Sequence, residues 1–190
     1  FLEGPVGSGK TTTAVHRILH LINRGVPADK ILVLLPQRTL VEPYVRMEQS
    51  SEFPDGGKLE ILTLGGLAQR SITLFWPMVA AEAGFRFPHR PPVYLTLETA
   101  QYFLSTIVTP LLSEGYFSSL TIDRNRLLSQ ILDNLNKAAV AGFPVEDIAG
   151  RLKASWVGDP SQFHLYDEAQ ECALRFRNFC FQNNLLDYSL

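Results

Sequence analysis

The sequence predicts an α/β fold in which a doubly wound parallel sheet is followed by an all-helical part. Three observations support this prediction. A glycine-rich loop opens the chain and leads into a helix, and apolar runs typical of buried strands follow at 31–35 and 59–64. Beyond the proline-rich stretch 85–94, apolar residues recur only at helical spacing. The β-α-β-α-β-α order of the first part is typical of a parallel sheet with helices on both faces.

The elements expected in the first part begin with a helix over 10–23, which Gly25 and Pro27 end. The run 31–35 has no alternation, so we expect a strand buried on both faces. The further elements are a helix over 39–49, a strand over 59–64 and a helix over 67–75.

In the second part, the stretch 85–94 carries three prolines and is interpreted as a linker. Asp123 is placed to cap a helix that ends at Gly142. No strand is expected here; the remaining helices are predicted over 96–108, 145–156 and 160–182.

Composition limits the function classes. The 190 residues are enough for one domain, or for one domain and part of another, and 46% hydrophobic residues give a sizeable core. A net charge of −2 provides no general basic field, so any nucleic-acid binding is expected in a local groove. No apolar run approaches the roughly 20 residues of a membrane helix, so no membrane partner is expected.

The chain has two cysteines, Cys172 and Cys180. On one helix, eight residues would separate them by about 12 Å, which is too far for a disulfide. They are interpreted as core cysteines of a reduced, cytoplasmic protein.

The opening loop carries the most specific motif. Gly4, Gly9, Lys10 and Thr11 fit G-x-x-x-x-G-K-[ST], the P-loop. The glycines let successive backbone N–H groups point at phosphate oxygens, and the helix adds the positive end of its dipole. A glycine-rich turn without a ligand is the competing interpretation.

This motif predicts ATP and Mg²⁺ as ligands. Lys10 is expected to reach the β- and γ-phosphates, Thr11 to bind Mg²⁺ through its hydroxyl, and Thr12 to contact the α-phosphate. Lys10 and Thr11 are therefore the catalytic candidates. The predicted nucleotide-binding residues are Gly4, Pro5, Gly7, Ser8, Gly9, Lys10, Thr11 and Thr12.

The order of motifs resembles the superfamily 1 DNA helicases of the UvrD/RecB type. The matching segments are GPVGSGKTT, ILVLLPQRTL, LEILTLGGLAQR and, after a helical stretch, YDEAQECALRFRNFCFQNNLLDYSL. The resemblance implies an incomplete P-loop NTPase (RecA-like) parallel sheet with an inserted all-helical subdomain. Its boundaries would be 1–88 for the motor domain, 89–185 for the insertion and 186–190 for the return to the motor domain. In the last segment, the family outline is matched by Tyr166, Gln170, Leu186, Asp187 and Tyr188.

The resemblance also implies a function. The chain would be the ATP-binding amino-terminal part of a helicase or translocase that acts on single-stranded DNA in repair or recombination. A nuclease or second helicase subunit would be a further partner. We expect Arg70 to contact phosphate as well. The implied DNA-binding residues are Pro36, Gln37, Arg38, Thr39, Thr63 and Gly65.

The tetrapeptide 167–170 reads DEAQ, a form of the acidic motif that holds Mg²⁺ in helicases. The preceding GDPSQFHLY is not a buried strand, and the following apolar residues repeat at helical spacing. Asp167 and Glu168 are therefore expected in the first turn of a helix, where the dipole favours acids. On this interpretation the catalytic acid lies outside the chain. We expect the chain alone, read as part of a longer protein, to bind nucleotide weakly and hydrolyse almost none.

Two alternatives stay open. PQRTL stands where the family more often has a Thr-Asn-Lys-Ala-like run, and DYSL lacks a second acid. These departures also fit the AddB type of helicase–nuclease subunit, a scaffold whose ATP site is vestigial. The other alternative is a P-loop kinase of small substrates. Such kinases have an arginine-rich lid, and the arginines at 124, 126, 175 and 177 form no dense cluster.

Overall fold

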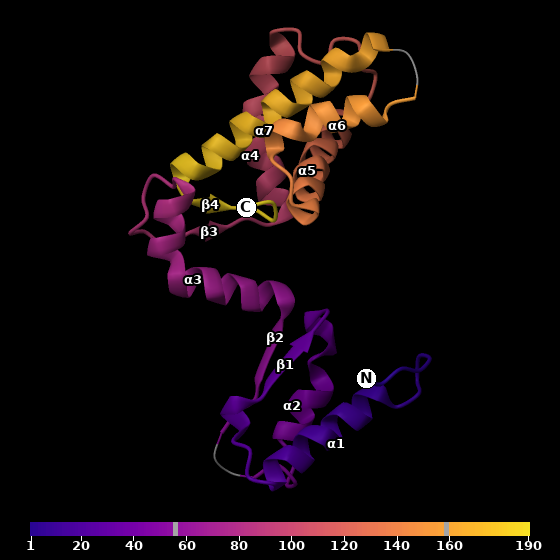
Figure 1. Ribbon diagram of the computed structural model, residues 1–190, viewed down its shortest axis with the longest axis vertical. Coiled ribbons are helices and arrows are strands. Elements are labelled where there is room, and N and C mark those ends of the chain that lie inside the picture. Colours follow the sequence, from indigo (N-terminus) through magenta and orange to yellow (C-terminus); the bar gives the residue numbers. More distant parts are fainter. Residues whose placement is uncertain (55–56, 158–159) are drawn as a thin grey trace. The chain divides into compact units, whose positions relative to one another are not determined.

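The structure is a computed structural model that describes residues 1–54, 57–157 and 160–190 (Figure 1). The chain divides into two compact units, Phe1–Leu74 and Phe75–Leu190. Each unit is described by itself.

Unit 1 begins with α1, which spans Lys10–Asn23 as predicted. Gly25 follows it with φ 90°, a left-handed conformation that favours glycine after a helix end. The other elements of this unit are a 3-10 turn at Ala28–Lys30, β1 (Leu32–Leu35), a 3-10 turn at Arg38–Leu40, α2 (Glu42–Glu48), β2 (Glu60–Thr63) and the first part of α3 (Leu64–Ala83).

β1 and β2 pair in parallel, with Leu32 opposite Glu60 and Leu35 opposite Thr63. The chain crosses between them through α2 (Figure 1). Because the strands are parallel, their carboxyl ends lie at the same edge of the sheet. The buried core of this unit joins one face of the sheet to α1 and α2. Its residues are Ile18, Leu19, Ala28, Leu35, Tyr44, Met47 and Leu59.

The predicted fold class is wrong. Across its described residues the chain is mostly helical, with two short two-stranded parallel sheets in place of a doubly wound RecA-like sheet. Residues 1–9 form no strand. β1 is also not buried on both faces, since Leu32 and Leu34 are 44% and 43% exposed. Helices pack on only one face of this sheet, which leaves alternate side chains of the apolar run open.

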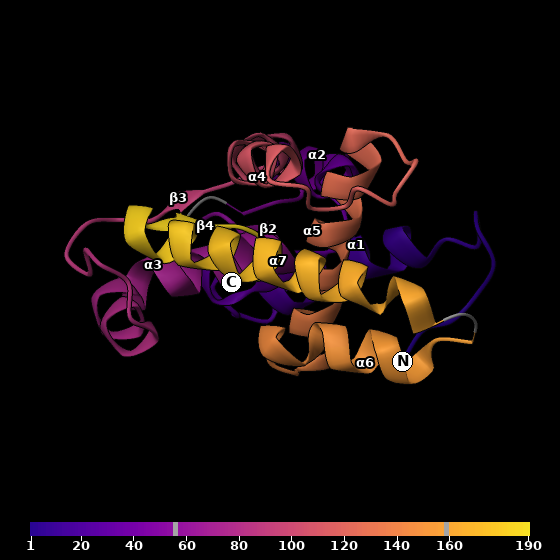
Figure 2. The same ribbon diagram turned by 90° about the horizontal axis from the view of Figure 1, so that it is seen from above.

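Unit 2 is built around three long helices, α4 (Leu97–Ser113), α5 (Arg124–Ala141) and α7 (Phe163–Asn183). Figure 2 shows α7 between α4 and the shorter α6 (Ile148–Ser155). α5 has the predicted cap, because the Asp123 carboxylate accepts hydrogen bonds from the N–H groups of Asn125 and Arg126. Gly142 ends that helix with φ 70°. Beyond the last part of α3, the elements are β3 (Val93–Tyr94), α4 (Leu97–Ser113), α5 (Arg124–Ala141), a 3-10 turn at Val145–Asp147, α6 (Ile148–Ser155), a 3-10 turn at Pro160–Gln162, α7 (Phe163–Asn183) and β4 (Leu185–Leu186).

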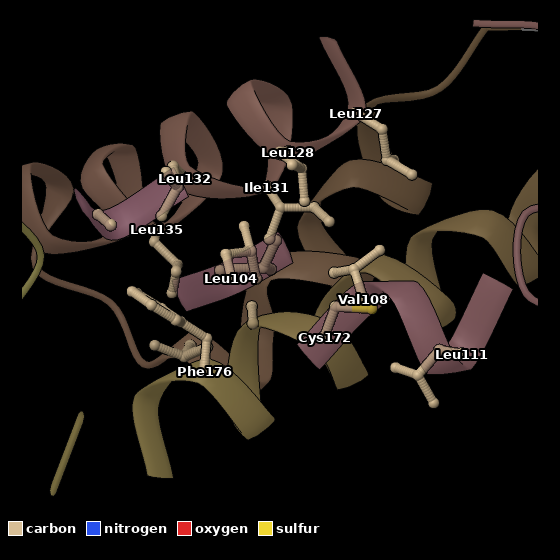
Figure 3. Close-up of a cluster of buried hydrophobic side chains, with 14 of the residues drawn as sticks. Leu104, Val108, Leu111, Leu127, Leu128, Ile131, Leu132, Leu135, Cys172 and Phe176 are labelled. Atoms are coloured by element: carbon tan, nitrogen blue, oxygen red, sulfur yellow. The ribbon is translucent and has the colours of Figure 1, made fainter. Parts of the chain in front are cut away.

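The core of unit 2 lies where α4, α5 and α7 meet. In Figure 3 their side chains point toward one another, Leu104 and Val108 from α4, Ile131 and Leu135 from α5, and Cys172 and Phe176 from α7. Cys172 and Cys180 are free and buried, as predicted. Burial raises the pKa of both thiols to about 12, because the thiolate would be desolvated.

Three local predictions for unit 2 were wrong. β3 pairs in parallel with β4, with Val93 opposite Leu185, where no strand was expected. α3 continues through Pro77 to Ala83, beyond the expected end at 75. α7 begins at Phe163, so Asp167 and Glu168 lie in its second turn and not in its first.

Candidate phosphate-binding loop

The glycine-rich loop turns directly into α1. Gly7 and Gly9 have φ values of 81° and 82°, in the left-handed region where a side chain is strained. Gly9 is the residue before the first helical turn, and no side chain caps that turn. The Ser8 N–H donates to the Pro5 carbonyl at 3.3 Å, which closes the loop. The first N–H groups of α1 therefore receive no hydrogen bond from a capping side chain.

Gly4 packs closely against Ser8 within the loop. A Cβ at this position would lie 2.5 Å from the Ser8 Oγ and 3.2 Å from the Ser8 Cβ. A side chain at Gly4 would therefore require the Ser8 hydroxyl to rotate away and the Ser8 Cβ to shift slightly.

The Lys10 ammonium lies inside the loop. Its Nζ donates to the carbonyl oxygens of Gly4 at 2.6 Å and Pro5 at 2.7 Å, and it lies 3.4 Å from the Ser8 Oγ. The first turn of α1 contains no acidic residue. The charged group is therefore held by neutral oxygens, and phosphate oxygens would attract it more strongly.

The three threonines after Lys10 differ in their partners. The Thr13 hydroxyl donates to the Gly9 carbonyl at 3.0 Å, and the Thr13 N–H also donates to it at 2.9 Å. Within the part of the chain that the structure describes, the exposed hydroxyls of Thr11 and Thr12 make no hydrogen bond. They remain available to a ligand at the start of α1.

The residues of the loop and of the first turn of α1 fit a nucleoside triphosphate and its Mg²⁺. A Cβ at Gly7 or Gly9 would meet nothing within 4 Å, Lys10 supplies a charge, and Thr11 supplies a hydroxyl of the kind that binds Mg²⁺. Among residues 1–54, 57–157 and 160–190, no three His, Cys, Asp or Glu side chains gather as ligands for a resident metal ion.

The residues predicted to contact DNA lie in the loop after β1 and where β2 meets α3; Thr63 ends the strand, and Gly65 lies in the first turn of α3, where a loop was expected. Residues 36–39 follow β1 and are all exposed. The Thr39 hydroxyl donates to the Gln37 Oε1 at 3.5 Å. Thr63 ends β2, and its Oγ1 accepts from the Gly66 N–H at 3.0 Å. Because Leu35 pairs with Thr63, the structure brings the loop after β1 and the start of α3 to the same edge of the sheet.

Two parts of the predicted site, Arg70 and the loop 4–9, are not brought together with the rest in this way. Arg70 forms an ion pair with Glu60, so its guanidinium is already engaged. The ion pair could not be predicted from the sequence, because no fixed sequence spacing relates a strand residue to its ion-pair partner on the following helix. Among the described residues, no hydrogen bond joins the loop 4–9 to the ends of β1 and β2.

The DEAQ residues lie within a helix, as predicted, and hold unit 2 together. Asp167 pairs with Lys153. The Glu168 Oε2 accepts from the Phe117 N–H at 2.6 Å, and the Gln170 Oε1 accepts from the Ala149 N–H at 2.7 Å. The three polar side chains of this motif therefore connect α7 to its neighbours.

No family model matches the chain, and no curated protein matches its sequence. Among the described residues, no helix combines the length and the apolar character needed to cross a membrane.

Proposed function

We propose that residues 4–12 bind the phosphates of ATP, and that the chain is the ATP-binding part of a DNA helicase or translocase acting on single-stranded DNA in repair or recombination. One observation carries the first half of the proposal. The Lys10 ammonium lies within a glycine loop at the start of a 14-residue helix whose first turn has no acid. Such an arrangement favours an anion through the N–H groups, the dipole and the ammonium together.

Each residue of the loop has a role in this proposal. Lys10 would exchange the carbonyl oxygens of Gly4 and Pro5 for oxygens of the β- and γ-phosphates. Thr11 would bind Mg²⁺, and Thr12 would contact the α-phosphate. When bound, Mg-ATP supplies a phosphoanhydride bond whose hydrolysis can drive movement along DNA.

Support for DNA comes from the edge of the β1–β2 sheet. Loops at the carboxyl ends of adjacent parallel strands form a common ligand-binding edge. Here that edge carries the exposed Gln37, Arg38 and Thr39 beside Thr63. Among the described residues, Arg38 has no ion pair, so its guanidinium is available to phosphate.

The test is ATP hydrolysis by the full-length protein, with and without single-stranded DNA, beside the Lys10→Ala variant. DNA-stimulated hydrolysis that disappears in the variant supports the proposal. If nucleotide binds but DNA gives no stimulation, the protein is a helicase-like subunit with a vestigial site. If a small acceptor raises the rate instead, the protein is a P-loop kinase.

A further inference from the structure

The proline-rich stretch 85–94, interpreted from sequence as a linker, has a fixed conformation in unit 2. Asn184, which follows α7 with φ 53°, is only 4% exposed. Its Nδ2 donates to the carbonyl oxygens of Phe87 at 2.7 Å and Arg90 at 3.0 Å. Its Oδ1 accepts from the Phe87 N–H at 3.3 Å. One buried side chain therefore holds two points of this segment.

Further contacts fix the same segment. The Arg86 N–H donates to the Phe181 carbonyl at 3.1 Å, and the Trp76 indole N–H donates to the Arg90 carbonyl. The Phe85 ring packs edge-on against Phe181, with centroids 4.8 Å apart. The backbone from 85 to 90 is thus held from α3 and from the end of α7.

This fixed backbone presents a pair of arginines. The guanidinium carbons of Arg86 and Arg90 lie 5.1 and 4.8 Å from the centroid of the Phe87 ring, and both residues are exposed. A third guanidinium, that of Arg177, lies 6.0 Å from the Phe181 ring. Contact with an aromatic ring orients a guanidinium and reduces the entropy lost when it binds a ligand. We refer to Arg86, Phe87, Arg90 and Arg177 as the arginine platform.

The platform has an unbalanced positive charge. In the part of the chain that the structure describes, Arg46 pairs with Glu42, Arg70 with Glu60 and Arg175 with Glu171. None of the three platform arginines takes part in an ion pair among these residues. The segment 84–93 also contains no acid. The local field therefore favours an anion, although the net charge of the chain is −2.

We propose that the arginine platform binds the backbone of single-stranded nucleic acid. Guanidinium groups match phosphate oxygens with two parallel hydrogen bonds, and neighbouring arginines can contact successive phosphates. Their flat faces can also stack on exposed bases, which a single strand offers and a duplex does not. The choice of DNA over RNA rests on the function proposed above.

The test uses the purified chain and a fluorescent 20-nucleotide oligothymidylate, with binding followed by anisotropy at several salt concentrations. The variant is Arg86→Ala with Arg90→Ala. The matched control is Arg151→Ala, which removes another arginine that lies over a ring, 4.2 Å from the Phe143 centroid. Circular dichroism and urea unfolding establish that each variant is folded.

We expect the double variant to bind the oligonucleotide at least tenfold more weakly than the wild type does. The affinity of the control variant should stay within twofold of the wild-type value. Each phosphate contact to a single strand contributes about 0.7 to the slope of log K against log salt, so the loss of two contacts lowers that slope by about 1.4. Unchanged affinity in the double variant, equal binding of a duplex of the same length, or no oligonucleotide binding by the wild type overturns the inference.

Nucleotide binding, measured on the same proteins, separates this inference from the proposed function. The double variant should bind ATP as the wild type does. If ATP fails to bind any of these proteins while oligonucleotide binding still depends on Arg86 and Arg90, the proposed function is wrong. The inference about the arginine platform is then retained.

Discussion

The Lys10 Nζ lies 2.6 Å from the carbonyl oxygen of Gly4, six residues earlier in the chain. The lysine thereby closes its own loop, and the two ends of the motif are in direct contact. An anion that enters the loop must compete with two carbonyl oxygens, those of Gly4 and Pro5. Because phosphate carries a full charge and a carbonyl oxygen does not, the exchange favours the phosphate.

The first prediction concerns the close contact at Gly4. In the Gly4→Ala variant, the new Cβ would lie 2.5 Å from the Ser8 Oγ, so the Ser8 hydroxyl, which lies 3.4 Å from the Lys10 Nζ, must move. We expect the dissociation constant for ATP to rise about tenfold, which corresponds to about 1.4 kcal/mol. Isothermal titration calorimetry measures this change.

Two further variants make that test specific. Adding Ser8→Ala removes the clashing oxygen, so the double variant should recover part of the affinity. Gly150→Ala is the control, because a Cβ there meets nothing within 4 Å. If Gly4→Ala binds ATP as tightly as the Gly150 variant, the close packing of the loop has no role in binding.

The second prediction concerns Glu168, which belongs to the helicase-like DEAQ sequence. Because Glu168 accepts a hydrogen bond from the Phe117 N–H at 2.6 Å, its role is structural. We expect Glu168→Gln to lower the free energy of unfolding by about 1 kcal/mol. ATP affinity should stay within twofold of the wild type. Loss of nucleotide binding with unchanged stability would assign the acid to the site.

The third prediction concerns the left-handed residue after α7. Asn184→Gly keeps a conformation with φ 53° accessible but removes the side-chain hydrogen bonds to Phe87 and Arg90. We expect the free energy of unfolding to fall by about 1–3 kcal/mol. Asn184→Ala should cost about 1 kcal/mol more, because alanine is strained at positive φ. Urea unfolding measures both, and equal stability of the glycine variant and the wild type contradicts this role.

The fourth prediction is a pH dependence. Burial raises the pKa of Cys172 and Cys180 to about 12, whereas an unfolded thiol titrates near about 8.5. The protonated thiols thus contribute a stability that is fully present below about pH 8.5 and is lost as the pH rises toward 12.

The measurement for this prediction is urea unfolding between pH 7 and pH 10. Above pH 9 the wild type should lose up to about 1 kcal/mol per pH unit for each thiol, relative to the variant Cys172→Ala with Cys180→Ala. In native protein at pH 8, neither thiol should react with iodoacetamide. Parallel pH curves for wild type and variant, or rapid native alkylation, would show that the thiols are accessible.

Sequence alone identified the helices that carry their own boundary signals. α5 has Asp123 at one end and Gly142 at the other, and α1 begins within a motif and ends before Gly25. These capping signals act between residues close together in the sequence, so they do not depend on contacts with the rest of the chain. The glycine-rich loop at 4–12 could be recognised from the sequence for the same reason.

The sheets were not predictable in this way. The run 31–35 is apolar at every position, but only contacts far along the chain decide whether Leu32 and Leu34 are covered. β3 and β4 are two residues long and lie about 90 residues apart, so neither has a periodicity of its own. The ion pair of Arg70 with Glu60 and the arginine platform likewise depend on tertiary contacts.

The measurement that most directly tests the central claim is the equilibrium binding of ATP, with Mg²⁺, to the chain and to its Lys10→Ala variant. Lys58→Ala is the control, since it removes an exposed lysine of the same unit outside the loop. If the loop binds phosphate, the Lys10 variant should bind ATP at least tenfold more weakly, and the control should match the wild type. Equal affinity in all three proteins, or no binding by the wild type, would contradict the account.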